Sequence, residues 1–263
     1  IAALSSTVRN LETLAKDDVS SLALLGRSVM HDNALTSRIL RVANSAIYNK
    51  GISQISTVSR AAVVLGFDSI RNICITAKLL TSLLENNHLS KGVYERLLKL
   101  MAQSFQAAML ARMMMNDRGD ALREEVFIAS LLYRIGESAF WSMGGEFTDS
   151  LDRKLTTATD KTEQHFIIRA ELGTSFLQLT QGIARSWGLG EVLLKSLSQP
   201  DERMPEIRCI FIADKLSEAL TLSEVNPKEL QKYLTQAADL LDVSVEEMTN
   251  RVIHCSENTH KLA

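Results

Sequence analysis

Helix-breaking residues are scarce in this chain, and their scarcity constrains the fold more than any other feature of the sequence. The 263 residues include only 3 prolines and 12 glycines. These two residues interrupt helices most strongly, so long stretches of the chain can be helical without interruption. No stretch shows the alternating, β-branched pattern that is typical of a strand. The sequence therefore predicts an all-α fold, and its length is sufficient for a sizeable buried core.

The first quarter of the chain carries a capped amphipathic helix and a second helix that ends at a glycine. Asp32 precedes an apolar-periodic stretch over 34–46, and an acidic side chain at that place caps a helix N-terminus. Asn44 and Ser45 stand where that helix ends and can hydrogen-bond the carbonyl groups left unpaired there. Gly66 stands where glycine favours the end of the next helix, because it adopts positive φ readily. We interpret these residues as a structural corner rather than as ligand contacts.

Further helices are predicted along the remainder of the chain. A long helix covers about 93–115, and a strongly apolar helix over about 124–143 is closed by the glycine pair at 144–145. The apolar spacing and the cap residues predict four more helices, over 162–179, 206–222, 227–241 and 244–257.

Charge is distributed unevenly along the chain, although the net charge is only -2. Residues 31–80 carry six basic and two acidic side chains, a balance of +4, whereas residues 201–263 carry seven basic and twelve acidic, a balance of -5. A basic front part permits an anionic partner. Solvated helix faces are the commoner explanation of such a pattern, and we favour it here.

The sequence predicts a cytoplasmic location. No run approaches the roughly 18 apolar residues that a membrane-spanning helix needs, and no basic-then-apolar leader opens the chain. The three cysteines, Cys74, Cys209 and Cys255, lie far apart without a CxxC pair, which is typical of reduced thiols and suggests no zinc site.

The motifs of the first quarter resemble the hallmark of the HDOD family, which consists of bacterial regulatory domains related to HD-type metal phosphohydrolases. The resemblance extends over roughly residues 4–220. It implies a multi-helix HD-like bundle with an N-terminal helical subdomain, divided as 1–88, 89–222 and a C-terminal helical part at 223–263. The residues that carry the motif are Asp32, Leu40, Asn44, Ser45, Ala46, Tyr48, Leu65 and Gly66.

The same resemblance implies that the metal site of HD hydrolases is degenerate in this chain. Those enzymes gather histidines and aspartates from several helices to hold a metal that activates water. Here Tyr133-Arg134 stands where the family's His-Asp pair belongs, and only Asp214 survives as a ligand type. The other degenerate positions are Gln103, Arg169, Ser198 and Gln199. His31-Asp32 is also a His-Asp pair, but Asp32 is better explained as a helix cap.

A specific ion pair follows from this comparison. Arg134 is a permanent cation at the place where the family binds metal, and it opposes metal binding there. A partly buried carboxylate needs a partner, which a bidentate arginine supplies. We therefore predict that the Arg134 guanidinium takes the place of the metal and pairs with Asp214; the alternative is that Arg134 points into solvent.

The function predicted from the resemblance is that of a non-catalytic module in bacterial signal transduction, where HDOD domains often accompany receiver, diguanylate cyclase or EAL domains. We expect no cofactor, a protein partner, no membrane contact, and a small ligand as a further binding option. Two alternatives remain. One is a metal-dependent phosphohydrolase with an altered site. The other is nucleic-acid binding through the helices and +4 charge of residues 31–80, which the acidic net charge disfavours.

Overall fold

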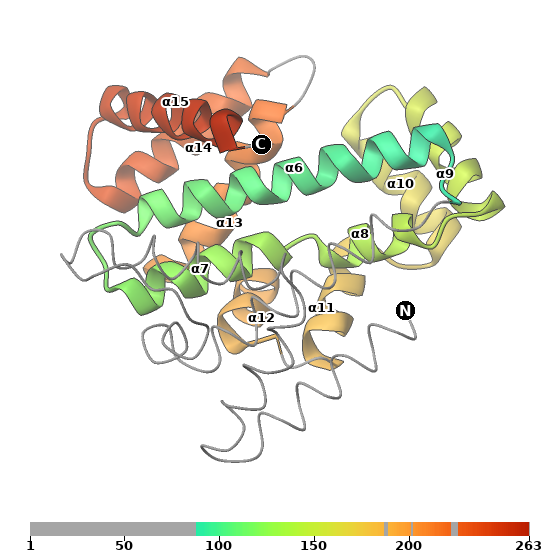
Figure 1. The fold of residues 1–263 in the computed structure, drawn as a ribbon, viewed down its shortest axis with the longest axis horizontal. Coiled ribbons are helices and arrows are strands. Elements are labelled where there is room, and N and C mark those ends of the chain that lie inside the picture. Colours follow the sequence, from blue (N-terminus) through green and yellow to red (C-terminus); the bar gives the residue numbers. More distant parts are fainter. Residues whose placement is uncertain (1–87, 187–188, 201, 222–225, 263) are drawn as a thin grey trace. The chain divides into compact units, whose positions relative to one another are not determined.

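The computed structural model describes residues 88–262 except 187–188, 201 and 222–225 (Figure 1). The chain divides into two compact units, residues 1–82 and residues 83–263. The predicted boundary at 88–89 lies close to this division, and the predicted C-terminal part belongs to the same unit as the bundle. The HDOD motif residues between Asp32 and Gly66 lie outside the described residues, so the corner predicted for them stays a prediction.

The described residues are helical and contain no strand, which confirms the all-α prediction. The helices are α6 (Lys91–Met114), α7 (Asp120–Leu132), α8 (Ile135–Ser142), α9 (Glu146–Thr157), α10 (Lys161–Leu172), α11 (Phe176–Ser186), α12 (Glu191–Ser198), α13 (Pro205–Thr221), α14 (Pro227–Leu241) and α15 (Val245–Leu262).

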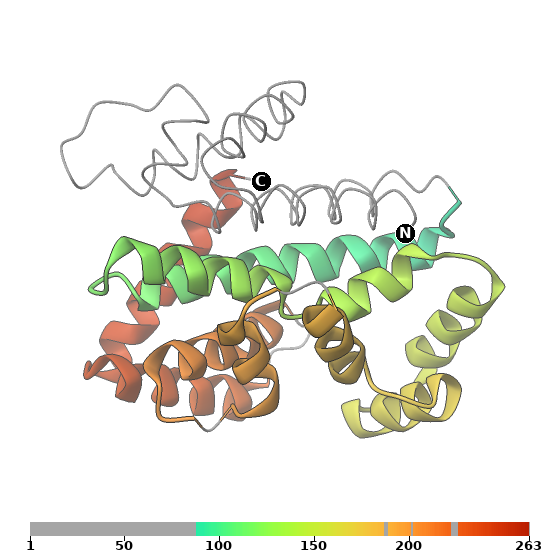
Figure 2. The same cartoon turned by 90° about the horizontal axis from the view of Figure 1, so that it is seen from below.

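α6 is the central helix of this unit. Its buried positions recur at helical spacing and include Val93, Leu97, Leu100, Ala107 and Leu110, so one broad stripe of the helix is apolar. That stripe packs chiefly against α7 and α13. Each fully buried leucine stabilises the fold by about 2 kcal/mol. Figure 2 shows α6, α7 and α8 in one layer, with α11, α12 and α13 packed against it.

The single helix predicted over 124–143 is wrong. The structure divides this stretch into α7 and α8, with Tyr133 and Arg134 forming the break. The predicted end is correct: Gly144 has φ 65° and Gly145 has φ 93°, a conformation that glycine adopts without strain.

The single helix predicted over 162–179 is also wrong. α10 ends at Leu172 and is followed by Gly173, whose φ of 68° is left-handed, and α11 begins at Phe176. A glycine in this conformation terminates a helix because the chain then turns away from the helix axis. Together, α9 and α10 lie at the end of the unit where α6 begins (Figure 1).

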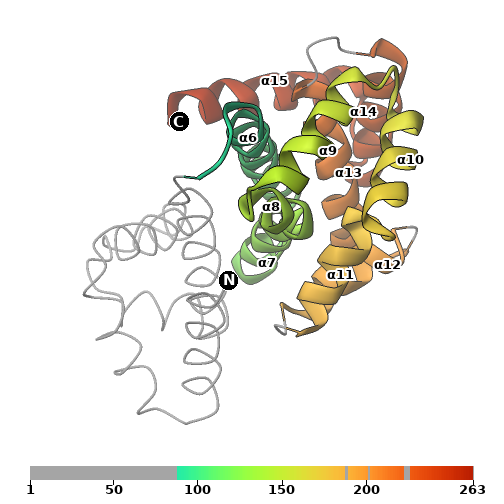
Figure 3. The same cartoon turned by 90° about the vertical axis from the view of Figure 1, so that its right-hand side faces the viewer.

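The two C-terminal helices pack on the bundle. α14 lies against α13, and α15 contacts both α14 and α6 (Figure 3). The Asn226 side chain caps α14 by accepting hydrogen bonds from two backbone amides, and Pro227 occupies the first turn, where its missing N–H costs nothing. Among the helices described, none is long and apolar enough to cross a membrane.

Candidate functional site

The break between α7 and α8 determines where the Arg134 side chain lies. Arg134 is the N-cap of α8, with φ -111° and ψ 25°, and its carbonyl oxygen accepts a hydrogen bond from the Ser138 amide at 3.1 Å. These dihedrals lie outside the α-helical range, so the chain changes direction at this residue. The side chain is 20% exposed, and its guanidinium lies against α13.

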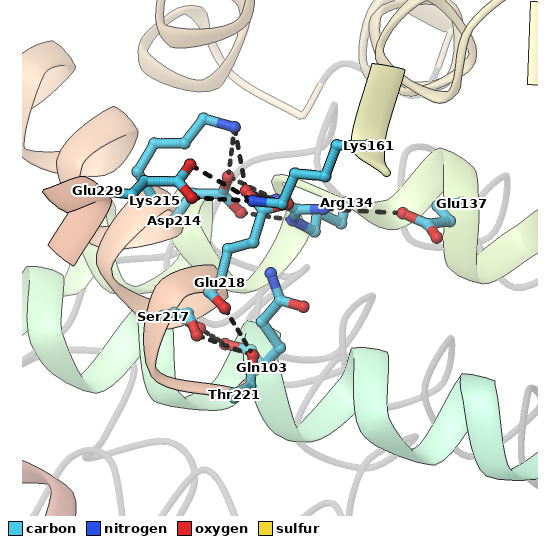
Figure 4. A network of polar contacts seen from close by, with 10 residues as sticks. All are labelled: Gln103, Arg134, Glu137, Lys161, Asp214, Lys215, Ser217, Glu218, Thr221 and Glu229. Atoms are coloured by element: carbon cyan, nitrogen blue, oxygen red, sulfur yellow. Dashed lines mark hydrogen bonds and ion pairs between the residues drawn. The ribbon is translucent and has the colours of Figure 1, made fainter. Parts of the chain in front are cut away.

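Asp214 on α13 receives that guanidinium. Arg134 Nε donates to Asp214 Oδ1 at 2.6 Å, and Arg134 Nη2 donates to Oδ2 at 2.8 Å. Asp214 is only 2% exposed, and a carboxylate so deeply buried is costly unless a charged partner compensates for its lost hydration. The structure thus brings together the two residues for which the sequence predicts an ion pair (Figure 4).

Five further charged side chains surround this pair, and the seven residues together are called the Arg134 cluster below. Glu218 lies 3.3 Å from Arg134 Nη2, and Glu137 lies 3.8 Å from Nη1. Lys161 lies 3.5 Å from Glu218 and 3.3 Å from Glu229, while Lys215 lies 3.3 Å from Glu218. The cluster joins α8, α10, α13 and α14 (Figure 4) and consists of Arg134, Glu137, Lys161, Asp214, Lys215, Glu218 and Glu229.

The cluster shifts the pKa values of two of its carboxyl groups in opposite directions. Burial works against the ionised form of Glu218, but Arg134, Lys215 and Lys161 outweigh it and lower the pKa of Glu218 to about 2. For Glu137 burial dominates and raises the pKa, although Arg134 and a hydrogen bond from Trp141 Nε1 at 3.2 Å favour the ionised form. Burial by itself would lower the pKa of Arg134. The charge of Asp214 and its hydrogen bonds outweigh that effect and raise the pKa, so Arg134 stays charged.

The lowered pKa of Glu218 predicts a specific loss of stability in acid. Because its folded pKa lies below the unfolded value of 4.5, ionised Glu218 stabilises the fold above about pH 4.5, and this contribution falls as the pH drops toward 2. The Glu218→Gln variant should therefore lose on the order of 2 kcal/mol near neutral pH and almost nothing near pH 2.

Urea unfolding of Glu218→Gln and wild type between pH 2 and pH 7 measures this difference. Glu246→Gln, which removes an exposed carboxylate from the first turn of α15, is the matched control and should change the free energy of unfolding much less than Glu218→Gln near neutral pH. A destabilisation by Glu218→Gln that is independent of pH would contradict the electrostatic explanation.

Gln103, one of the positions that the sequence predicts to be degenerate, lies on α6 next to the cluster (Figure 4). Its backbone oxygen accepts a hydrogen bond from Ser217 Oγ at 2.6 Å, which ties α6 to α13. The residue is 8% exposed, and its Nε2 is buried without a hydrogen-bond partner within the described part of the protein. An amide nitrogen donates hydrogen bonds and does not bind metal, so Gln103 contributes no ligand from this atom.

The remaining predicted positions do not meet in one site. Tyr133 is adjacent to the cluster, and burial and the Asp214 charge raise the pKa of its hydroxyl. Arg169, Ser198 and Gln199 are exposed, and no hydrogen bond or ion pair joins them to Arg134 or Asp214 in the part of the chain that the structure describes. Sequence reasoning missed Glu137, Lys161, Lys215, Glu218 and Glu229 as members of the cluster.

The described residues do not fit an HD-type metal centre. Such a centre needs a set of imidazole and carboxylate ligands that converge on one point. Over residues 88–262, with the gaps given above, no group of three or more His, Cys, Asp or Glu side chains is placed to hold a metal ion. Both oxygens of Asp214 already accept hydrogen bonds from Arg134, whose positive charge also repels a cation.

The described residues form an all-helical bundle with an HD-like fold. Residues 1–202 match the HDOD domain family, and the chain belongs to that family. Asp214 and Glu218, which lie on α13, follow the matched range. No relative was found among the curated proteins.

Solved structures share the same HD-like fold. A conjectured phosphohydrolase from Shewanella amazonensis SB2B is 18% identical, with a TM-score of 0.62 and coverage of 98% of this chain and 93% of that one. An HDOD domain protein of unknown function from Geobacter sulfurreducens is 18% identical, with a TM-score of 0.60 and coverage of 97% and 90%.

A third structure is longer than this chain. It is a conjectured signal transduction protein from Marinobacter aquaeolei VT8, 19% identical with a TM-score of 0.58, and the match covers 97% of this chain but 56% of that one. Identities this low establish a shared fold and do not transfer an activity.

Proposed function

We propose that this HDOD protein is a non-catalytic regulatory module of a bacterial cytoplasmic signalling pathway, which acts by binding another protein. One observation carries the proposal: Arg134 binds both oxygens of Asp214, the one residue of a ligand type at the positions where HD enzymes hold metal. A guanidinium in that place supplies charge balance but no activated water, so the chemistry of hydrolysis has no starting point.

The family supports the regulatory part of this proposal. HDOD domains resemble HD hydrolases in fold and occur in bacterial signal transduction, and the match covers residues 1–202 of this chain. The Arg134 cluster keeps the bundle intact without metal, because an arginine and a carboxylate replace the metal–ligand bonds that would otherwise join these helices. Such a bundle offers stable helical surfaces for a partner protein.

A hydrolysis assay with added metal tests the proposal. p-Nitrophenyl phosphate and bis(p-nitrophenyl) phosphate are incubated with the chain and Mn²⁺, Fe²⁺, Ni²⁺ or Mg²⁺, and turnover should equal that of the buffer with each metal. Asp214→Asn, which removes the charge of the only retained ligand position, should give the same result as the wild type. Metal-dependent turnover that Asp214→Asn abolishes would overturn the proposal in favour of a phosphohydrolase with an altered site.

A further inference from the structure

α10 attaches to the bundle with very little buried apolar surface. Of its 12 residues only Ile168 is buried, and its one aromatic side chain, Phe166, is 73% exposed. Buried apolar area supplies most of the free energy that holds a helix against its neighbours. By comparison, α9 buries Thr148, Leu151 and Leu155 over the same length. The attachment of α10 therefore depends on polar contacts as well, and one of them is an ion pair between Lys154 of α9 and Glu171 near the end of α10.

Ion pairs supply the contact between the start of α10 and the Arg134 cluster. Lys161 Nζ lies 3.5 Å from Glu218 on α13 and 3.3 Å from Glu229 on α14. The Glu218 carboxylate is shared, since its other oxygen lies 3.3 Å from Arg134 Nη2 (Figure 4). Lys161 is 39% exposed, so water and salt ions compete with these pairs more effectively than with the Arg134–Asp214 pair.

The chain on both sides of α10 permits the start of the helix to move away from α13 and α14, while the Lys154–Glu171 pair holds its other end to α9. Gly173 follows the helix in the left-handed conformation, with φ 68°, and only a short turn separates it from α11. Ahead of the helix, the Asp160 side chain accepts the Glu163 amide hydrogen at 2.8 Å, while Glu163 accepts hydrogen bonds from Thr159. These caps are local, so α10 remains a helix after its contacts to α13 and α14 break.

We infer that α10 is a lid on the Arg134 cluster, held closed by Lys161 and opening well before the rest of the bundle unfolds. Opening removes Lys161 from Glu218 and leaves the Glu218 carboxylate and the Arg134 guanidinium accessible from solvent. Competing ions or a charged partner surface would open it, because the contact to be broken is ionic. This behaviour is independent of whether the chain has catalytic activity.

Hydrogen exchange followed by mass spectrometry on the full chain tests the lid. In wild type at low salt, amides of α10 should exchange faster than those of α13, since opening of the lid does not require global unfolding. Lys161→Gln should accelerate exchange in α10 by about three- to fivefold, the range for partly exposed ion pairs. Lys228→Gln removes an exposed charge from the first turn of α14 and is the matched control, with no effect expected on α10.

Salt and arginine labelling provide two independent readouts of the same opening. Salt at 0.5 M, roughly enough to reduce the Debye length well below 10 Å, should bring wild-type α10 to the exchange rate of Lys161→Gln and leave that variant unchanged. Labelling of Arg134 by phenylglyoxal should accelerate in parallel, while labelling of the exposed Arg169 stays constant. The inference is wrong if α10 and α13 exchange at the same rate, or if Lys161→Gln and Lys228→Gln behave alike in both measurements.

Discussion

Replacing Arg134 by leucine should lower the free energy of unfolding by about 3–5 kcal/mol, the usual cost of removing one partner from a buried ion pair. The variant leaves the Asp214 carboxylate, which is 2% exposed, without the guanidinium that binds both of its oxygens. Glu218 and Glu137 lose the same cation, which adds repulsion among three neighbouring carboxyl groups. Urea unfolding monitored by circular dichroism measures the change.

Two companion variants separate the ion pair from simple packing at this position. Arg134→Lys keeps the positive charge but loses the bidentate hydrogen bonding to Asp214, so it should lower the free energy of unfolding less than Arg134→Leu does. Arg134→Leu combined with Asp214→Leu removes both buried charges and should recover much of the lost stability, because burying two apolar groups is often as favourable as burying an ion pair. The loss of unfolding free energy in the double variant is compared with the summed losses of Arg134→Leu and Asp214→Leu. If the two values are equal, the residues are not coupled and the account of the site is wrong.

Gly136→Ala should lower the free energy of unfolding by about 1–3 kcal/mol, the range for overpacking a tight contact. A Cβ atom at Gly136 would lie 2.7 Å from Thr180 Oγ1 and 2.8 Å from the carbonyl carbon of Leu179, and closer still to the Thr180 amide nitrogen. Two of these atoms are backbone, so α8 and α11 must separate. The hydrogen bond from the Gly136 amide to Thr180 Oγ1, at 3.0 Å, would be stretched as well.

Gly182→Ala is the control for this substitution, on the opposite helix of the same pair. Gly182 lies within α11, is exposed, and has no neighbouring atom within 4 Å of an added Cβ. Alanine is the better helix former, so this variant should gain about 0.5–1 kcal/mol. Thermal or urea unfolding of both variants measures the contrast. Equal stability of Gly136→Ala and wild type would mean that α8 and α11 do not approach as closely as the structure shows.

The helices could be predicted from the sequence wherever residues at their own ends, such as caps, prolines and glycines, determine where they begin and end. The range predicted for 227–241 coincides with α14, because a proline in its first turn and an apolar stripe define it locally. The break at Tyr133–Arg134 could not be predicted in this way. The apolar pattern continues from Leu132 to Ile135 across the break, and the interaction that the break serves joins residues 80 positions apart.

The site likewise contains residues that the sequence could identify and residues that it could not. The pairing of Arg134 with Asp214 was predicted from family positions, and Glu218 could have been added, because it lies four residues after Asp214 on one face of α13. Lys161 and Glu229 give no comparable signal. Their place in the cluster depends on how α10 and α14 pack against α13, which neither periodicity nor local spacing determines.

Metal content measured by inductively coupled plasma mass spectrometry tests the central claim most directly, on the chain purified without a chelator or a metal-affinity tag. The account predicts iron, manganese, zinc and nickel far below one ion per chain, because the Arg134 guanidinium already binds both oxygens of Asp214 and repels a cation there. Tightly bound metal in a stoichiometric amount that Asp214→Asn removes would contradict it, and would make the chain a metal-binding member of its family.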